Sequence, residues 1–89
     1  MSVLDQAWAL APQVSVRPEP FGALLYHFGT RRLSFLKDRR LLAVVQGLAE
    51  VPSARHACAS AGVDAGDMTA YERALDRLAA TDMLRERGR

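Results

Sequence analysis

The sequence predicts an α+β domain, in which a small three-stranded antiparallel sheet is followed by a three-helix bundle. Apolar and polar residues alternate between residues 13 and 37, which is typical of strands, and the apolar period becomes helical after Lys37. The chain has 89 residues, of which 49% are hydrophobic, so a single domain over residues 1–89 is expected. Three short strands cannot bury themselves. The helices must therefore cover one face of the sheet, as in a winged helix with its wing placed first, and one sheet edge stays open.

The first twelve residues predict an N-terminal arm that docks by one face. Leu4, Trp8 and Ala11 recur at helical spacing, and Pro12 ends the segment. An arm of this kind over residues 1–12 adds apolar contacts to a core that lies elsewhere in the chain.

Residues 13–37 predict a meander of three antiparallel strands. The first strand is indicated by Val14, which starts an alternation of apolar and polar residues that a proline pair ends. Residues 23–28 predict a second strand that is fairly apolar on both faces, and Gly29 can supply the positive φ of a type II′ turn. The third strand is expected over Arg31–Lys37.

Three helices are expected over residues 38–82. Asp38 can cap the first helix, whose apolar residues recur at helical spacing. A second helix over residues 52–61 has small side chains on one face and ends at Gly62. The inward-facing residues of these two helices are Leu41, Val44, Val45, Leu48, Ala54, Ala57, Cys58 and Ala61.

The last helix runs to about Asp82, and two caps compete for its start. Asp64 can cap it directly, whereas the Thr69-x-x-Glu72 pattern forms a capping box further along. Beyond the helix, residues 83–84 can return to the core, and residues 85–89 are expected as a solvated tail. The apolar face of this helix consists of Met68, Tyr71, Leu75, Leu78 and Ala79.

No metal site and no self-contained catalytic site are predicted. His56 and Cys58 lie two residues apart on a helix and point in different directions, so they cannot share a metal ion. Cys58 lies among alanines as a small core residue, and His27 is expected on the sheet surface. The sequence has no Gly-rich phosphate loop and no nucleophile elbow. We therefore expect a protein that is not an enzyme and that holds no cofactor.

The sequence also favours a cytoplasmic protein without a membrane partner. A lone cysteine excludes an intrachain disulfide, which fits a reducing compartment. The N-terminus lacks the basic and apolar regions of a signal peptide. The longest aliphatic run, residues 41–45, is far shorter than the ~20 residues that span a bilayer.

The charge distribution bears on whether nucleic acid is a partner. A short helix, a turn over residues 61–63 and a longer helix are similar to a helix-turn-helix, so a DNA-binding protein is the alternative interpretation. Residues 64–82 carry five carboxylates and two arginines, a net charge of −3, which phosphate would repel. Basic residues gather instead over residues 31–40, with a net charge of +4. We therefore expect no nucleic-acid partner.

A basic strand at an open sheet edge can pair with an incoming peptide strand. Residues 31–37 have this position in the predicted meander. The simpler interpretation is an ordinary edge strand that its charges protect from aggregation, and the residues alone leave both interpretations open. A homodimer through the same edge also stays open.

Three stretches of the chain resemble one known family. They are Arg17-Pro-Glu-Pro-Phe-Gly-Ala-Leu-Leu-Tyr-His-Phe-Gly-Thr-Arg-Arg-Leu-Ser-Phe-Leu-Lys37, Ala-Gly-Val-Asp at 61–64 and Ala-Tyr-Glu-Arg-Ala-Leu at 70–75. The chain resembles the peptide chaperones of mycofactocin biosynthesis, which are PqqD-like RiPP recognition elements, and the similarity covers nearly its whole length.

The resemblance implies a carrier of a ribosomally made precursor peptide. In that family the leader of the precursor adds to the third strand and lies against the last helix. The chaperone then presents the MftA-like precursor to an MftC-like radical SAM maturase, which holds the iron–sulfur clusters and SAM and acts on a C-terminal Val-Tyr.

Carried onto this sequence, the resemblance places the peptide site on the third strand and on the last helix, from about Met68 to Leu78. Tyr71 and Leu75 are candidates for the groove floor, with plain core residues as the equal alternative, and the strand face that meets the peptide is open. The candidate peptide-binding residues are Arg31, Arg32, Leu33, Ser34, Phe35, Leu36, Lys37, Met68, Tyr71, Leu75 and Leu78.

Overall fold

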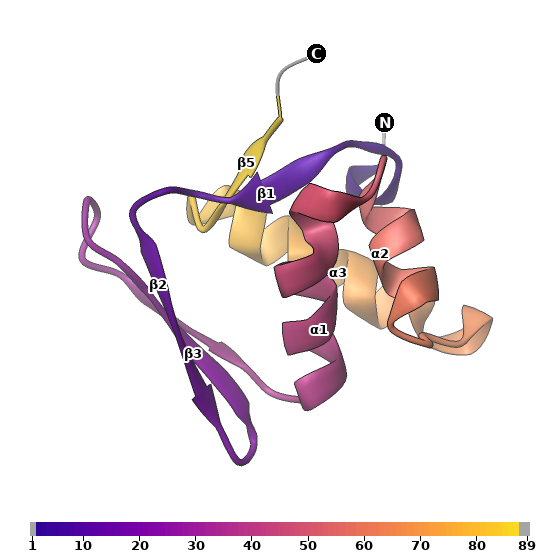
Figure 1. Ribbon diagram of the computed structural model, residues 1–89, viewed down its shortest axis with the longest axis horizontal. Coiled ribbons are helices and arrows are strands. Elements are labelled where there is room, and N and C mark those ends of the chain that lie inside the picture. Colours follow the sequence, from indigo (N-terminus) through magenta and orange to yellow (C-terminus); the bar gives the residue numbers. More distant parts are fainter. Residues whose placement is uncertain (1, 88–89) are drawn as a thin grey trace.

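A computed structural model describes residues 2–87 and confirms the α+β class, with a three-stranded antiparallel sheet and three α-helices. Figure 1 shows the sheet on one side of the molecule and the helices on the other. In chain order the elements are the 3₁₀ turn η1 (Val3–Asp5), β1 (Trp8–Leu10), β2 (Val14–Glu19), β3 (Gly22–His27), β4 (Leu33–Leu36), α1 (Arg39–Gly47), η2 (Leu48–Glu50), α2 (Ala54–Ser60), η3 (Ala65–Asp67), α3 (Met68–Ala80) and β5 (Leu84–Glu86).

The main sheet has the order β2-β3-β4, so β4 is an edge strand. The central strand β3 begins at Gly22, whose φ of 154° lies in a region that favours glycine. A Cβ on this residue would overlap the backbone carbonyl oxygen of Leu36 on β4. Only glycine therefore lets β4 lie this close to the β2–β3 turn.

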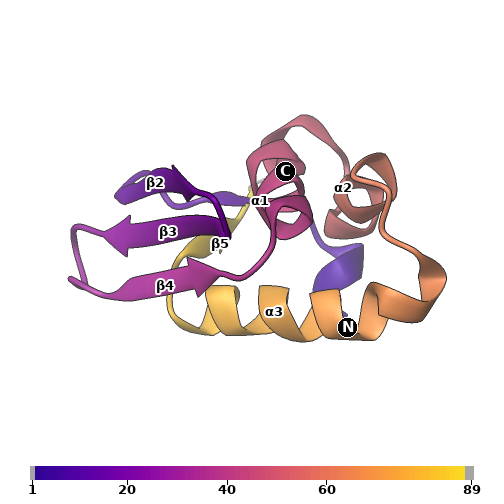
Figure 2. The same ribbon diagram turned by 90° about the horizontal axis from the view of Figure 1, so that it is seen from below.

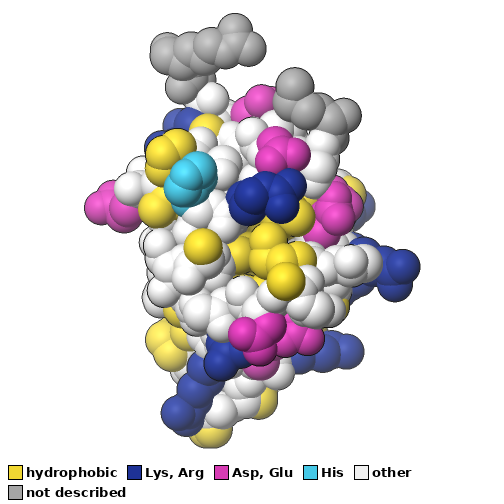
Figure 3. All heavy atoms as spheres, turned by 90° about the vertical axis from the view of Figure 1, so that its right-hand side faces the viewer, with side chains coloured by type: hydrophobic (Ala, Val, Ile, Leu, Met, Phe, Trp, Pro, Cys, Tyr) yellow, Lys and Arg dark blue, Asp and Glu magenta, His cyan; other side chains and the backbone are white. Residues whose placement is uncertain are grey.

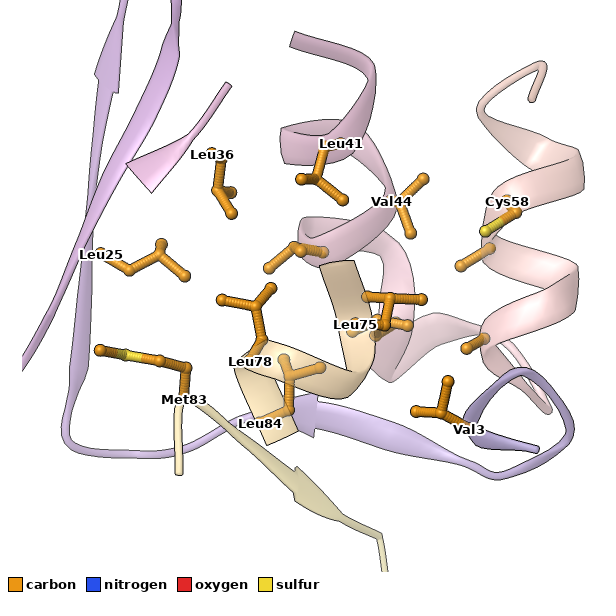
Figure 4. Close-up of a cluster of buried hydrophobic side chains, with 14 of the residues drawn as sticks. Val3, Leu25, Leu36, Leu41, Val44, Cys58, Leu75, Leu78, Met83 and Leu84 are labelled. Carbon is orange, nitrogen blue, oxygen red and sulfur yellow. The ribbon is translucent and has the colours of Figure 1, made fainter. Parts of the chain in front are cut away.

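The core lies between the sheet and the helices. Figure 4 shows Leu25 and Leu36 of the sheet together with Leu41 of α1, Leu78 of α3 and Met83, and each is at most 8% exposed. Asp38 caps α1 as predicted, because its side chain accepts a hydrogen bond from the backbone N–H of Leu41. The inward-facing residues expected for α1 and α2 are buried, except that Ala61 is half-buried.

The N-terminal segment is not the helical arm that its spacing predicts. Residues 8–10 form β1, which pairs antiparallel with β5, so that Trp8 lies opposite Glu86. The Trp8 indole N–H donates to the carbonyl of Val3 at 2.9 Å and closes the segment onto η1. Residues 85–86 are exposed as expected but are part of a strand rather than a tail, and residues 88–89 of that expected tail lie outside the described residues.

The connection between β3 and β4 also differs from the predicted type II′ turn. The positive φ, 61°, belongs to Arg31 and not to Gly29. His27, expected on the surface, is only 5% exposed, and its Nδ1 accepts the backbone N–H groups of Gly29 and Thr30 at 3.0 Å each. The buried imidazole thus holds the loop in place. The third strand is shorter than expected, because Arg31 and Arg32 lie in this loop and Lys37 follows β4.

Neither predicted cap starts the last helix. Asp64 precedes η3 without a side-chain hydrogen bond, and Thr69 lies inside α3. The helix ends at Ala80, slightly before the expected position. Met83 and Leu84 return to the core as predicted, with exposures of 0% and 3%.

Candidate functional site

An open groove of about 650 Å³ runs between β4 and α3. Figure 2 shows the two elements side by side, with β4 at the free edge of the sheet. The groove is lined by Leu33, Ser34, Phe35, Leu36, Lys37, Asp38, Leu41, Ala70, Tyr71, Ala74, Arg77, Leu78 and Thr81.

The strand side of the groove presents unpaired backbone groups. The His27 N–H donates to the Arg32 carbonyl at 3.0 Å, and the register continues with Leu25 opposite Ser34. Hydrogen-bonded and non-bonded pairs alternate along an antiparallel ladder, so Ser34 bonds to β3 whereas Leu33 and Phe35 do not. The backbone N–H and C=O groups of Leu33 and Phe35 therefore point to the open edge.

The two faces of β4 differ in burial. Leu36 is 1% exposed and packs into the core, and Ser34, on the same face, is half-buried. Leu33 and Phe35 point to the other face, away from the helices, and are 59% and 60% exposed. This settles which side-chain row of the strand touches the core.

The helix side of the groove is formed by one face of α3. Its lining residues recur at helical spacing from Ala70 to Thr81, beyond the last turn of the helix. Ala70 and Ala74 have the smallest side chains of this row, so they leave the space between strand and helix open. Tyr71 and Leu78 lie beside them and make the wall apolar.

One end of the groove is fixed by Asp38. Its Oδ1 accepts hydrogen bonds from the Leu41 N–H at 2.6 Å and from the Tyr71 hydroxyl at 3.1 Å, which joins the start of α1 to α3. Partial burial, together with the hydrogen bond to Asp38, raises the pKa of Tyr71 above its ordinary value. The phenol therefore keeps its proton at neutral pH and remains the donor.

Basic side chains flank the open edge at both ends. Arg31 and Arg32 lie in the loop before β4, and Lys37, Arg39 and Arg40 follow it. All five are exposed, and none of them forms an ion pair within residues 2–87. The edge therefore lies in a positive local field.

The described residues hold no cluster of His, Cys, Asp or Glu that could bind a metal ion, and none of their helices is long and apolar enough to cross a membrane. Cys58 is fully buried, and this burial raises the pKa of its thiol above the ordinary value, so the thiol stays protonated. On the α2 side, Figure 3 shows acidic and basic side chains interspersed around a few apolar ones, without a continuous basic surface on the coloured residues.

Seven of the eleven predicted site residues line the groove: they are Leu33, Ser34, Phe35, Leu36, Lys37, Tyr71 and Leu78. Leu75 is fully buried beneath the groove, which makes it a core residue, and Met68 lies outside the lining. Arg31 and Arg32 lie at the end of the edge.

Sequence reasoning missed the lining residues Asp38, Leu41, Ala70, Ala74, Arg77 and Thr81. Those on the helix continue the row of Tyr71 and Leu78 at spacings of three or four. This signal becomes visible only when the strand that faces the helix is known.

An open strand edge beside an apolar groove suits an extended peptide. The fold and the site are therefore those of a peptide-binding domain. Comparison with known proteins agrees with this class. Residues 7–85 match the model of the peptide chaperone MftB family. No solved structure matches the chain.

Curated relatives carry the same description. The chain is 64% identical to the peptide chaperone MftB of Mycobacterium tuberculosis and 60% identical to that of Mycobacterium ulcerans, over 90% of this chain and 73% of each relative. It is 55% identical to the one from Mycolicibacterium smegmatis, over 90% of this chain and 78% of the relative. The chain belongs to the peptide chaperone MftB family. Chaperoning a peptide is a binding role, so the protein is not an enzyme.

Proposed function

We propose that this chain binds the leader of a ribosomally made precursor peptide as an added strand on β4 and presents it to a radical SAM maturase in mycofactocin biosynthesis. The observation that carries the proposal is the unpaired backbone of Leu33 and Phe35 at a sheet edge that borders an apolar groove. The proposed site consists of the groove residues together with Arg31 and Arg32.

Backbone pairing alone gives little net affinity. Leu33 and Phe35 offer two N–H and two C=O groups, so four hydrogen bonds form, each contributing about 0.5–1.5 kcal/mol net. Ordering a flexible segment costs about 2–5 kcal/mol. These amounts nearly cancel, so apolar contacts in the groove must supply the net free energy of binding. The hollow beside Ala70 and Ala74 is wide enough to accept side chains of the added strand.

The charge around the edge favours an acidic leader. The five flanking basic residues are exposed and without ion pairs in residues 2–87, so acidic residues on either side of the bound segment find partners. The proposed precursor is MftA-like and the proposed maturase MftC-like. The maturase supplies the iron–sulfur and SAM chemistry in the cytoplasm, while this chain supplies binding and delivery.

The test is a titration of isotope-labelled protein with a synthetic precursor peptide, followed through backbone amide chemical shifts. We expect 1:1 binding, with shifts concentrated in residues 33–38 and 70–81, while α2 stays unchanged as an internal control. An absence of shifts would contradict the proposal, and a short DNA duplex would then test the helix-turn-helix alternative. Shifts confined to α2 would move the peptide site to another face.

A further inference from the structure

The part of the outer sheet face that β3 and β4 form, which points away from the helices, is apolar and uncovered, whereas β2 contributes Ser15 and Arg17 to that face. Four large apolar side chains are exposed within residues 2–87, at 47–62%: Phe21, Phe28, Leu33 and Phe35. The rings of Phe21 and Phe35 lie 6.4 Å apart between centroids, at an angle of 45°. We call Phe21, Leu33 and Phe35 the outer apolar patch, because they gather along the β4 side of this face.

Phe28 belongs to the same face but to its other end. It packs edge-on against Tyr26, with ring centroids 5.2 Å apart. Both residues lie at the end of the central strand β3 or just after it, one strand away from the open edge. The outer apolar patch therefore borders the edge, and Phe28 does not.

Strand geometry connects this patch to the peptide site. In an added strand, residues level with Ser34 and Leu36 direct their side chains into the groove, and the intervening residues direct theirs to the outer face. Directly opposite side chains in such a pair have Cβ atoms about 4.5–5.5 Å apart. A side chain opposite Leu33 or Phe35 would therefore contact the outer apolar patch.

We propose that the bound segment is recognised on both of its faces, so that apolar side chains are required at consecutive positions and not only at alternate ones. One row fills the groove, and the interleaved row covers Leu33 and Phe35. This inference rests on the proposed strand addition and specifies its ligand, an extended peptide that is apolar on both faces and flanked by acidic residues. The contact between Phe21 and Phe35 holds the patch in position before the peptide arrives.

The first experiment compares Phe35→Ser with Phe28→Ser by titrating each with the synthetic precursor peptide in a calorimeter. The two phenylalanines have nearly equal exposure, 60% and 62%, and lie on the same sheet face. We expect Phe35→Ser to weaken binding about tenfold and Phe28→Ser to change it less than about twofold, since ~1.4 kcal/mol corresponds to one decade. Leu33→Thr serves as a second patch variant, because it removes the apolar side chain and introduces a β-branched residue that strands favour.

The second experiment replaces each leader residue by alanine and measures binding to wild-type protein and to Phe35→Ser. We expect one leader position whose alanine penalty disappears in Phe35→Ser, while its two neighbours keep theirs. Wild-type affinity in both patch variants would overturn two-faced recognition. Ala74→Glu places a charged side chain in the groove and tests strand addition separately. If this variant abolished binding while both patch variants bound normally, strand addition would stand without two-faced recognition. An absence of binding by the wild-type protein would refute the proposed function.

Sedimentation of the free protein tests whether a second copy of the chain, instead of the peptide, covers the outer apolar patch. We expect Phe35→Ser and wild type to sediment alike. A wild-type dimer that Phe35→Ser converts to a monomer with tighter peptide binding would overturn the proposal.

Discussion

Gly22 and His27 shape the sheet at its two ends, one as the start of β3 and the other as its last residue. The position of Gly22 has no room for a side chain, because the Leu36 carbonyl oxygen occupies the space. His27 fills the interior of the β3–β4 loop, where its Nδ1 accepts two backbone hydrogen bonds. Both residues therefore position β4, although neither lies in the groove.

Gly22→Ala is expected to destabilise the protein by about 2 kcal/mol or more, because it adds backbone strain to a steric overlap. Gly47→Ala is the matched control. This glycine ends α1, and a Cβ on it would meet nothing within 4 Å, so the change should stabilise by roughly 0.5–1 kcal/mol. Chemical denaturation of the three proteins measures both effects. Equal stabilities for the two variants would contradict this account of Gly22.

The sequence predicts the structural role of some of the residues that position β4 and α1, and it does not predict the role of others. Asp38 is found as a helix cap because the pattern is local: a polar residue directly before a helical apolar period. His27 is missed because its burial depends on how five residues after β3 fold back, which no local spacing indicates.

At the scale of elements, the alternation of bonding along β4 separates two kinds of position. The backbone of Ser34 belongs to the ladder with β3, and the backbones of Leu33 and Phe35 face the open edge. Proline is tolerated in an edge strand where its missing N–H would face solvent. The same substitution therefore has different consequences at neighbouring residues.

Leu33→Pro is expected to change the free energy of unfolding by less than about 1 kcal/mol and to weaken leader binding at least about tenfold, because it removes an N–H that the added strand needs. Ser34→Pro should instead cost about 1–3 kcal/mol of stability, since it removes a hydrogen bond to β3 and leaves the partner carbonyl unpaired. Thermal unfolding and peptide titration of both variants check these expectations. A folded Leu33→Pro protein with unchanged affinity would exclude pairing at this residue.

Elements with a pattern in the local sequence are predictable here, and elements that depend on a partner distant in the chain are not. The main sheet and the three helices follow from the change of apolar period after Lys37. β1 and β5 have three residues each and pair across almost the whole chain, so their strand character comes from the partner and not from local sequence. The groove is missed in part for the same reason, because it exists only between β4 and α3.

For the whole molecule, charge placement matters more than net charge. The formal net charge is only +2, yet residues 31–40 carry +4 around the open edge and residues 64–82 carry −3. This separation was predictable from the sequence because it is a count along the chain. Its position relative to β4 was not, because it depends on the fold.

We expect leader binding to weaken about tenfold between low salt and ~1 M salt, as the screening length falls from about 30 Å to 3 Å. Arg31→Glu combined with Arg32→Glu should slow association about tenfold at low salt and change dissociation far less. Asp76→Ala, on the exposed side of α3, is the control and should leave both rates unchanged. Stopped-flow measurements over a salt series give these rates. Salt-independent affinity would rule out the electrostatic contribution.

The pairing of β1 with β5 brings together the places where the chain enters and leaves the fold. Arg87 strengthens this closure, because its side chain donates to the Ala49 and Val51 carbonyls and its N–H to the Ala7 carbonyl. Figure 1 shows β1 and β5 at the opposite end of the molecule from the β2–β3 turn. A tether fused to either side of the domain would therefore leave β4 accessible, and a short flexible one would hold the groove near an attached enzyme at an effective concentration in the millimolar range.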